Sequence, residues 1–191
     1  MILDIHPLLS IFGSLLIVNG FYNLSKLISK SKYLIFLENR AVPGRLISFF
    51  LVVNIFSIIL YNLFLLFGIN EDYLKILIIL LVLIGFYRPY NIQKLFKKYI
   101  LINTKTKLLL FVILLGYFVI SLLPITDSDS LDYHITLPYL SLLNENFFIQ
   151  KEWFTSQLAG AGEALIIFGL AVNAYKLSSI LQFAALLLII V

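Results

Sequence analysis

Long apolar runs, separated by short charged connections, dominate this chain. A membrane-spanning helix needs about 20 consecutive, mostly apolar residues, and four runs come close to that length. With 61% hydrophobic and only 13% charged residues, the chain also lacks the polar side chains that would cover a water-soluble fold. The strict apolar/polar alternation of barrel strands is absent. We therefore expect an all-α, polytopic transmembrane helical bundle with spans near residues 5–22, 46–69, 74–87 and 108–123.

The signs of the charged residues alternate from one connection to the next. The connections after the first and third runs are rich in Lys and Arg, whereas the turn after the second run carries Glu71 and Asp72. Because excess Lys and Arg mark cytoplasmic loops, we expect a multi-pass protein of the cytoplasmic (inner) membrane. Its N-terminus, the Glu71/Asp72 turn and the segment after Pro124 then lie outside. Membrane lipids and this topology also explain the net charge of +4, so nucleic-acid binding is not favoured.

The segment 125–163 is too polar to span and holds most of the acidic residues. Its apolar residues are spaced for short amphipathic helices on the outer membrane surface, with Pro138 dividing two of them. One or two further spans are expected within 164–191, interrupted around Lys176 by a hairpin or a polar kink. Because the chain ends inside an apolar helix, we interpret it as the N-terminal part of a longer protein. A complete chain with an embedded last helix is the alternative.

Asp127, Asp129, Asp132 and His134 lie within eight residues, directly beyond the fourth apolar run. If a helix begins here, Asp129 and Asp132 share one face. Close carboxylates bind a divalent cation through their oxygens, or one of them acts as a general base, and His134 adds a ligand or a proton relay. A solvated loop whose Asp and Ser residues cap a surface helix is the second interpretation. Since the chain has no Cys, a thiolate nucleophile and a Cys-based zinc site are excluded.

Two strings carry a family resemblance: TDSDSLDYHITLPYL, which begins at residue 126, and EWFTSQLAGAGEALIIFGLA, which begins at residue 152. They resemble the first large outer loop and the next helix of GT-C glycosyltransferases, in particular an uncharacterised branch found with surface-polysaccharide genes. The resemblance covers residues 108–191 and divides the chain there. Residues 1–107 then form an N-terminal membrane region of three spans, whereas the usual member of the group presents this loop after its first span.

The resemblance implies a membrane enzyme that transfers a sugar from a polyprenyl-phosphate donor to a glycan or glycolipid acceptor at the outer membrane face. It places the catalytic or metal-binding motif on Asp127 and Asp129, with Asp132 and His134 in support. By the same resemblance, a divalent cation is expected on Asp127, Asp129 and Asp132, and Glu163 accompanies the loop. A carboxylate such as Asp129 would deprotonate the acceptor, and a single base opposite the leaving group predicts inversion.

Other interpretations stay open beside this one. Glu163 at the start of a span also fits a carboxylate that the helix dipole favours. A transporter, flippase or polymerase-like envelope protein would use the acidic loop as a gate, although such proteins place ionisable or broken-helix features near the bilayer midplane. The predicted spans at 46–69, 74–87 and 108–123 show almost none of these features. An inactive fragment is the third interpretation.

Overall fold

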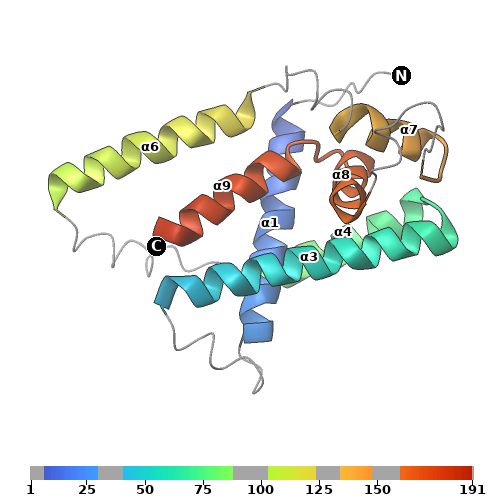
Figure 1. Ribbon diagram of the computed structural model, residues 1–191, viewed down its shortest axis with the longest axis horizontal. Helices are drawn as coiled ribbons and strands as arrows, with labels where there is room; N and C mark the ends of the chain where they lie inside the picture. The colour runs from blue at the N-terminus through green and yellow to red at the C-terminus, as the bar shows by residue number, and fades with distance from the viewer. Residues whose placement is uncertain (1–6, 30–40, 88–102, 124–133, 148–159, 191) are drawn as a thin grey trace.

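The computed structural model describes residues 7–29, 41–87, 103–123, 134–147 and 160–190. Within these ranges every regular element is a helix, which confirms the predicted all-α class. Figure 1 shows the helices in chain order: α1 (Pro7–Ser29), α3 (Ala41–Phe67), α4 (Glu71–Tyr87), α6 (Thr104–Leu122), α7 (Leu137–Leu143), α8 (Ala161–Ala171) and α9 (Leu177–Ile190).

Two helices are long and apolar enough to cross a membrane: Pro7–Ile28 within α1 and Leu46–Phe67 within α3. The third and fourth predicted spans also form helices, but α4 has 17 residues and the apolar part of α6 is confined to Leu108–Leu122. Helix α1 continues past Tyr22, where the sequence predicted its end, and includes Lys26. The apolar runs therefore located the helices, and among the described helices only α1 and α3 are both long and apolar enough to span a membrane.

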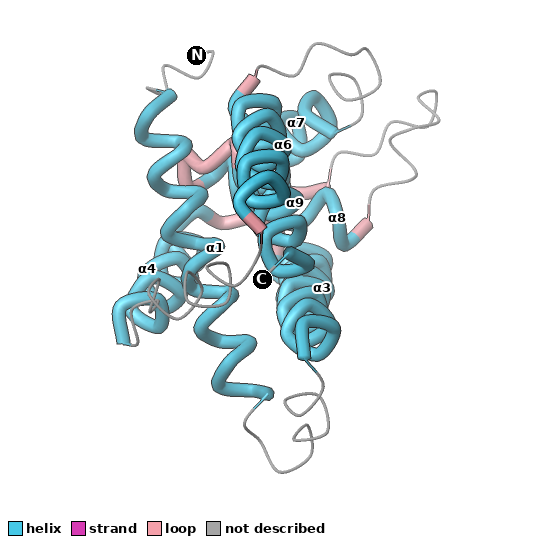
Figure 2. The backbone as a smooth tube through the Cα atoms, turned by 90° about the vertical axis from the view of Figure 1, so that its left-hand side faces the viewer, coloured by secondary structure: helices cyan, strands magenta, loops and turns pink. Residues whose placement is uncertain are grey.

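Helix α1 contacts α3, α4 and α9 and so forms the centre of the molecule. In Figures 1 and 2 it crosses α3 at a steep angle. Phe56 of α3 joins three helices, because its ring contacts Phe21 of α1 and Phe168 of α8 with centroids 5.0 and 5.3 Å apart. Phe21 and Phe168 are fully buried. The core thus lies where α1, α3 and α8 meet, while α6 packs on α9.

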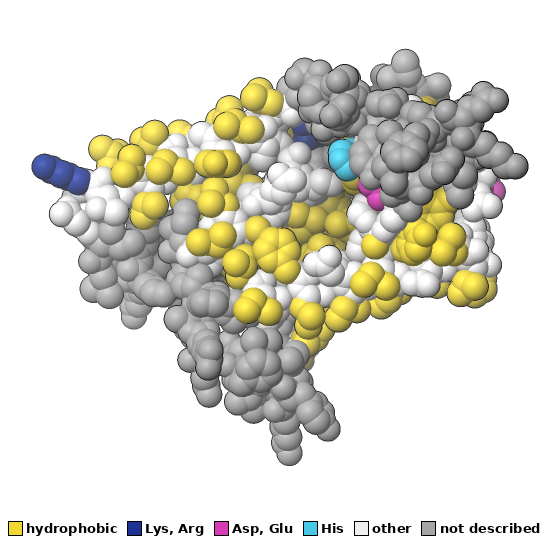
Figure 3. All heavy atoms as spheres, in the orientation of Figure 1, with side chains coloured by type: hydrophobic (Ala, Val, Ile, Leu, Met, Phe, Trp, Pro, Cys, Tyr) yellow, Lys and Arg dark blue, Asp and Glu magenta, His cyan; other side chains and the backbone are white. Residues whose placement is uncertain are grey.

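Much of the remaining surface is apolar. In Figure 3, hydrophobic side chains cover most of the described surface on the face shown. Helix α6 is the extreme case, with more than half of the side chain exposed at several large residues: Leu108, Leu109, Phe111, Val112, Tyr117 and Ile120. A water-soluble monomer rarely exposes contiguous apolar patches of this kind. The surface therefore fits contact with lipid or with further protein.

The polar segment contains a helix, but Pro138 does not divide two helices as the sequence predicted. Helical backbone runs continuously from His134 to Leu143, and Pro138 lies in the first turn of α7. A proline is tolerated in the first turn of α7 because its fixed φ is already close to the helical value. The predicted interruption near Lys176 is present: α8 ends at Ala171 and α9 begins at Leu177.

Candidate functional site at the start of α8

Glu163 lies in the first turn of α8 and folds back over the helix start. Its Oε2 accepts a hydrogen bond from the Gly160 backbone amide at 2.8 Å. Gly160 itself has extended backbone, with φ −148°, so the chain enters the helix abruptly. Ser57 of α3 donates from Oγ to the Ala161 carbonyl, which ties this helix start to α3. Only 7% of Glu163 is exposed, and the bond to the Gly160 amide holds its buried carboxylate in place.

The second oxygen of Glu163 faces His134. Glu163 Oε1 lies 3.5 Å from His134 Nδ1, and the two side chains are 9% and 47% exposed. Helix α7 packs on α8, and Leu137, Pro138 and Ser141 of α7 are buried. The packing of α7 on α8 places the His134 imidazole next to Glu163, so a buried carboxylate contacts a half-exposed histidine.

A buried carboxylate beside a half-exposed imidazole suits proton transfer. The carboxylate orients the ring, and the imidazole stays about half exposed, where a reacting group can reach it. A histidine and one carboxylate also provide two ligands for a divalent cation. Within the described parts of the chain, no group of three His, Asp or Glu side chains is placed to hold a metal.

Of the predicted site residues, the structure brings together His134 and Glu163. Asp127, Asp129 and Asp132 lie outside the described residues, so their catalytic and metal-binding roles stay predictions. The sequence named both members of the pair but did not predict their contact, since 29 positions separate them. The alternative prediction for Glu163, a carboxylate at a helix start, also holds, because its carboxylate accepts from the amide of the N-cap residue Gly160 as well as contacting His134.

Lys176 is a further candidate that the sequence interpretation treated only as part of a polar interruption. It is 4% exposed, and its Nζ donates to the carbonyl of Leu123 at the end of α6. The Tyr175 ring lies 5.3 Å from the same nitrogen. Burial lowers the pKa of this ammonium, which lies in the turn outside α8 and α9. The sequence did mark this residue, because Lys176 is the only charged residue after Glu163 in an otherwise apolar segment.

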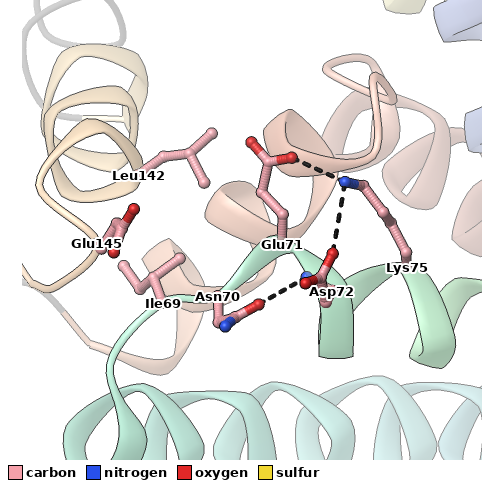
Figure 4. Close-up of a pocket in the computed structure, with 7 residues that line it drawn as sticks. All are labelled: Ile69, Asn70, Glu71, Asp72, Lys75, Leu142 and Glu145. Atoms are coloured by element: carbon pink, nitrogen blue, oxygen red, sulfur yellow. Dashed lines mark hydrogen bonds and ion pairs between the residues drawn. The ribbon is translucent and has the colours of Figure 1, made fainter.

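A pocket of about 280 Å³ lies between the α3–α4 turn and the end of α7. Figure 4 shows Lys75 beside Glu71 and Asp72, with its Nζ 3.0 and 3.9 Å from their carboxylate oxygens. These side chains are largely exposed, so the ion pairs contribute little to stability. Neither His134 nor Glu163 lines this pocket. Its carboxylates already face a lysine, and the pocket is separate from the candidate site.

The fold and the site together define a class: an all-helical protein with two helices able to cross a membrane and a Glu–His pair at the start of a buried helix. The chain belongs to the DUF1420 family, because the model of the DUF1420 N-terminal domain matches residues 9–191. No curated protein and no solved structure matches the chain.

Proposed function

We propose that this chain is part of a membrane glycosyltransferase that uses a polyprenyl-phosphate sugar donor at the outer face of the cytoplasmic membrane. The observation that carries the proposal is the contact between His134 and Glu163. His134 follows Asp132 by two positions, so a held proton-transfer pair adjoins the acidic motif in the sequence. The resemblance of both strings to GT-C enzymes supplies the reaction class.

Each residue of the proposed site has a separate role in the transfer. Asp129 accepts the proton of the acceptor hydroxyl as that oxygen attacks the anomeric carbon, and the phosphate of the donor leaves with the bonding electron pair. Glu163 holds the His134 ring, which passes the proton on to solvent. A divalent cation on Asp127 and Asp132 would offset the charge of the leaving phosphate. Attack opposite the leaving group inverts the anomeric carbon.

The membrane setting suits such a donor. An isoprenoid chain needs an apolar surface, and α3 and α6 expose large hydrophobic side chains along their length. In the proposed multi-pass topology the acidic segment lies outside, at the level of the lipid phosphates. The acceptor is a glycan or glycolipid of the cell envelope.

The test is sugar transfer in membranes that contain the full reading frame, with a panel of polyprenyl-phosphate hexoses as donors. We expect Asp129→Asn and Asp127→Asn to lose turnover by orders of magnitude, and Glu163→Gln and His134→Gln to lose about 10²- to 10⁴-fold, the usual contribution of general acid–base catalysis. Glu71→Gln is the matched control, since this exposed carboxylate lies at the separate pocket. Its turnover should equal that of the wild type.

Membrane abundance of each variant is measured in parallel, so that a folding defect is not mistaken for a catalytic one. Unchanged transfer by all four site variants would refute the site. A complete absence of transfer by the wild type across the donor panel would favour the transporter or flippase alternative.

A further inference from the structure

Ser57 is a buried hydroxyl within the apolar helix α3, and its hydrogen bond leaves that helix. Polar side chains in a helix often donate to a backbone carbonyl three or four residues earlier. Asn54 and Asn62 of α3 do so, each to the carbonyl four residues before it. Ser57 instead donates from Oγ to the carbonyl of Ala161, in the first turn of α8. The hydroxyl therefore joins two helices where its neighbours bond within one.

A second contact holds the same side of α8 on α3. Phe56, which precedes the serine in the sequence, packs its ring against Phe168 with the centroids 5.3 Å apart. Because successive helical residues are rotated by about 100°, Ala161 and Phe168 lie on one side of α8, about two turns apart. Glu163 lies on the opposite side, where it contacts His134. Helix α8 is thus attached to α3 at two points, and its other side carries the carboxylate.

The bond from Ser57 acts at the point where the Glu163 side chain is fastened. Glu163 Oε2 accepts from the amide of Gly160, the residue directly before Ala161. Without the Ser57 bond, the aromatic contact further along α8 would remain as a pivot, and the start of α8 would be free to shift. The bond is therefore placed to maintain the separation of 3.5 Å between Glu163 Oε1 and His134 Nδ1.

We propose that Ser57 is a positioning residue for the pair formed by Glu163 and His134. By holding the first turn of α8 on α3, its hydroxyl keeps the buried carboxylate in contact with the imidazole. The catalytic consequence of this contact rests on the proposed function. The positioning itself depends on no activity, so it can be measured separately.

Chemical modification of His134 tests the positioning without a substrate. Diethyl pyrocarbonate modifies histidine, and mass spectrometry reads the rate at His134, which is 47% exposed, separately from that at His6. A carboxylate beside Nδ1 keeps the ring proton on that nitrogen, so its loss in Glu163→Ala should slow the modification by about 3-fold or more. We expect Ser57→Ala to reproduce about half of this change or more. Ser57→Thr keeps the hydroxyl and should stay near the wild-type rate.

Asn54→Ala is the matched control, because it removes an exposed polar group of α3 whose bond stays within that helix. Its rate at His134 should equal that of the wild type. Equal rates in Ser57→Ala and the wild type would overturn the inference. An unchanged rate in Glu163→Ala would overturn it too, because the carboxylate would then have no influence on the ring.

Sugar transfer tests the catalytic consequence. We expect Ser57→Ala to lower kcat by about 10-fold at normal membrane abundance while KM stays within about 2-fold, since a small misplacement of a reacting group is costly. Ser57→Thr should recover most of kcat. In a Glu163→Ala background, Ser57→Ala should cause no further loss, because residues that act through one another are not additive. Additive losses in the double variant would overturn the positioning role.

The two measurements separate this inference from the proposed function. A changed modification rate at His134 with unchanged kcat in Ser57→Ala would reject the catalytic consequence while the enzyme assignment stands. If the wild type transfers no sugar, the catalytic consequence fails with the proposed function. The modification rates then still decide whether Ser57 holds Glu163 on His134.

Discussion

In the described parts of the chain, three residues with positive φ follow the ends of helices: Gly68 (φ 73°), Glu145 (φ 53°) and Asn173 (φ 59°). Gly68 and Glu145 are also in contact. The Ile69 amide donates to Glu145 O at 2.7 Å, and a Cβ at Gly68 would lie 2.8 Å from the same oxygen. The α3–α4 turn is therefore fastened to the end of α7 through backbone atoms, at a site where only glycine fits.

Gly68→Ala should destabilise the protein by roughly 2 kcal/mol, because a left-handed alanine costs about 1–2 kcal/mol and its Cβ also pushes against Glu145 O. Thermal unfolding in detergent should show a lower Tm. Glu145→Gly relieves the neighbouring strain without adding an atom, and we expect its Tm to equal or exceed that of the wild type. An unchanged Tm for Gly68→Ala would contradict this account of the turn.

Sequence reasoning at this scale located residue types but not their partners. Glu163 and His134 were singled out for their chemistry, yet their contact depends on how α7 packs on α8, which no local pattern records. Lys176 was visible as an isolated charge, whereas its carbonyl partner lies 53 positions earlier in the chain. Pro138 was assigned to a break because a proline inside a helix removes a backbone hydrogen bond and kinks or ends the helix.

At the scale of elements, helices α1 and α4 approach each other closely at two glycines, Gly20 of α1 and Gly85 of α4. A Cβ at Gly20 would lie 2.5 Å from the Leu81 carbonyl oxygen, and Gly85 faces Asn19. The amides of Asn19 and Asn23 donate to the Gly85 carbonyl at 3.2 and 3.0 Å. Small residues that admit a neighbouring backbone, with interhelical hydrogen bonds beside them, are the usual means of helix association in lipid.

We expect Gly20→Ala to separate α1 from α4 and to cost about 1–3 kcal/mol, the usual range for overpacking a close contact. Gly116 provides the matched control, since a Cβ there meets nothing within 4 Å on α6. Gly116→Ala should be neutral or stabilising by up to about 1 kcal/mol, because alanine is the better helix former. The Tm of the two variants is measured by thermal unfolding in the same detergent. Equal Tm values would contradict a close approach of α1 and α4 at Gly20.

The apolar runs predicted the existence of α1, α3, α4 and α6 because burial in lipid or protein demands a continuous apolar surface. Helix ends were less predictable. Helix α4 begins at Glu71 rather than beyond the acidic turn, since Glu71 and Asp72 favour a helix N-terminus and Asn70 accepts from the Asp72 amide at 2.7 Å. The steep angle between α1 and α3 could not be predicted from the residues of either helix, because it depends on how their side chains pack against each other.

At the scale of the whole molecule, the helix ends separate into two sets. In Figure 1 the start of α1, the end of α3 and the end of α6 lie along the upper and right-hand side, whereas their opposite ends lie along the left-hand and lower side. In the proposed topology, the charge bias would place the first set outside and the second in the cytoplasm.

Helix α4 is shorter than the hydrocarbon core that it would cross in the proposed topology. Its 17 residues extend roughly 26 Å at 1.5 Å per residue, whereas the hydrocarbon core is about 30 Å thick. Tilt would shorten its reach further, so a crossing requires local thinning of the bilayer or side chains that extend to the interface at the helix ends. Lys75 near one end and Tyr87 at the other are of the type that does so.

Two single cysteines in this cysteine-free chain decide whether α4 crosses. Asp72→Cys lies in the first turn of α4, and Lys105→Cys lies beyond the connection that follows α4; both positions are exposed. In right-side-out membrane vesicles, a membrane-impermeant maleimide should label position 72 at once and position 105 only after permeabilisation, while both react fully in denatured protein. Labelling of both positions from the outside would place α4 on the membrane surface, because two ends that face the same compartment cannot flank one crossing. The acidic segment would then lie on the cytoplasmic side if α6 crosses, where an outer-face sugar donor could not reach Asp129.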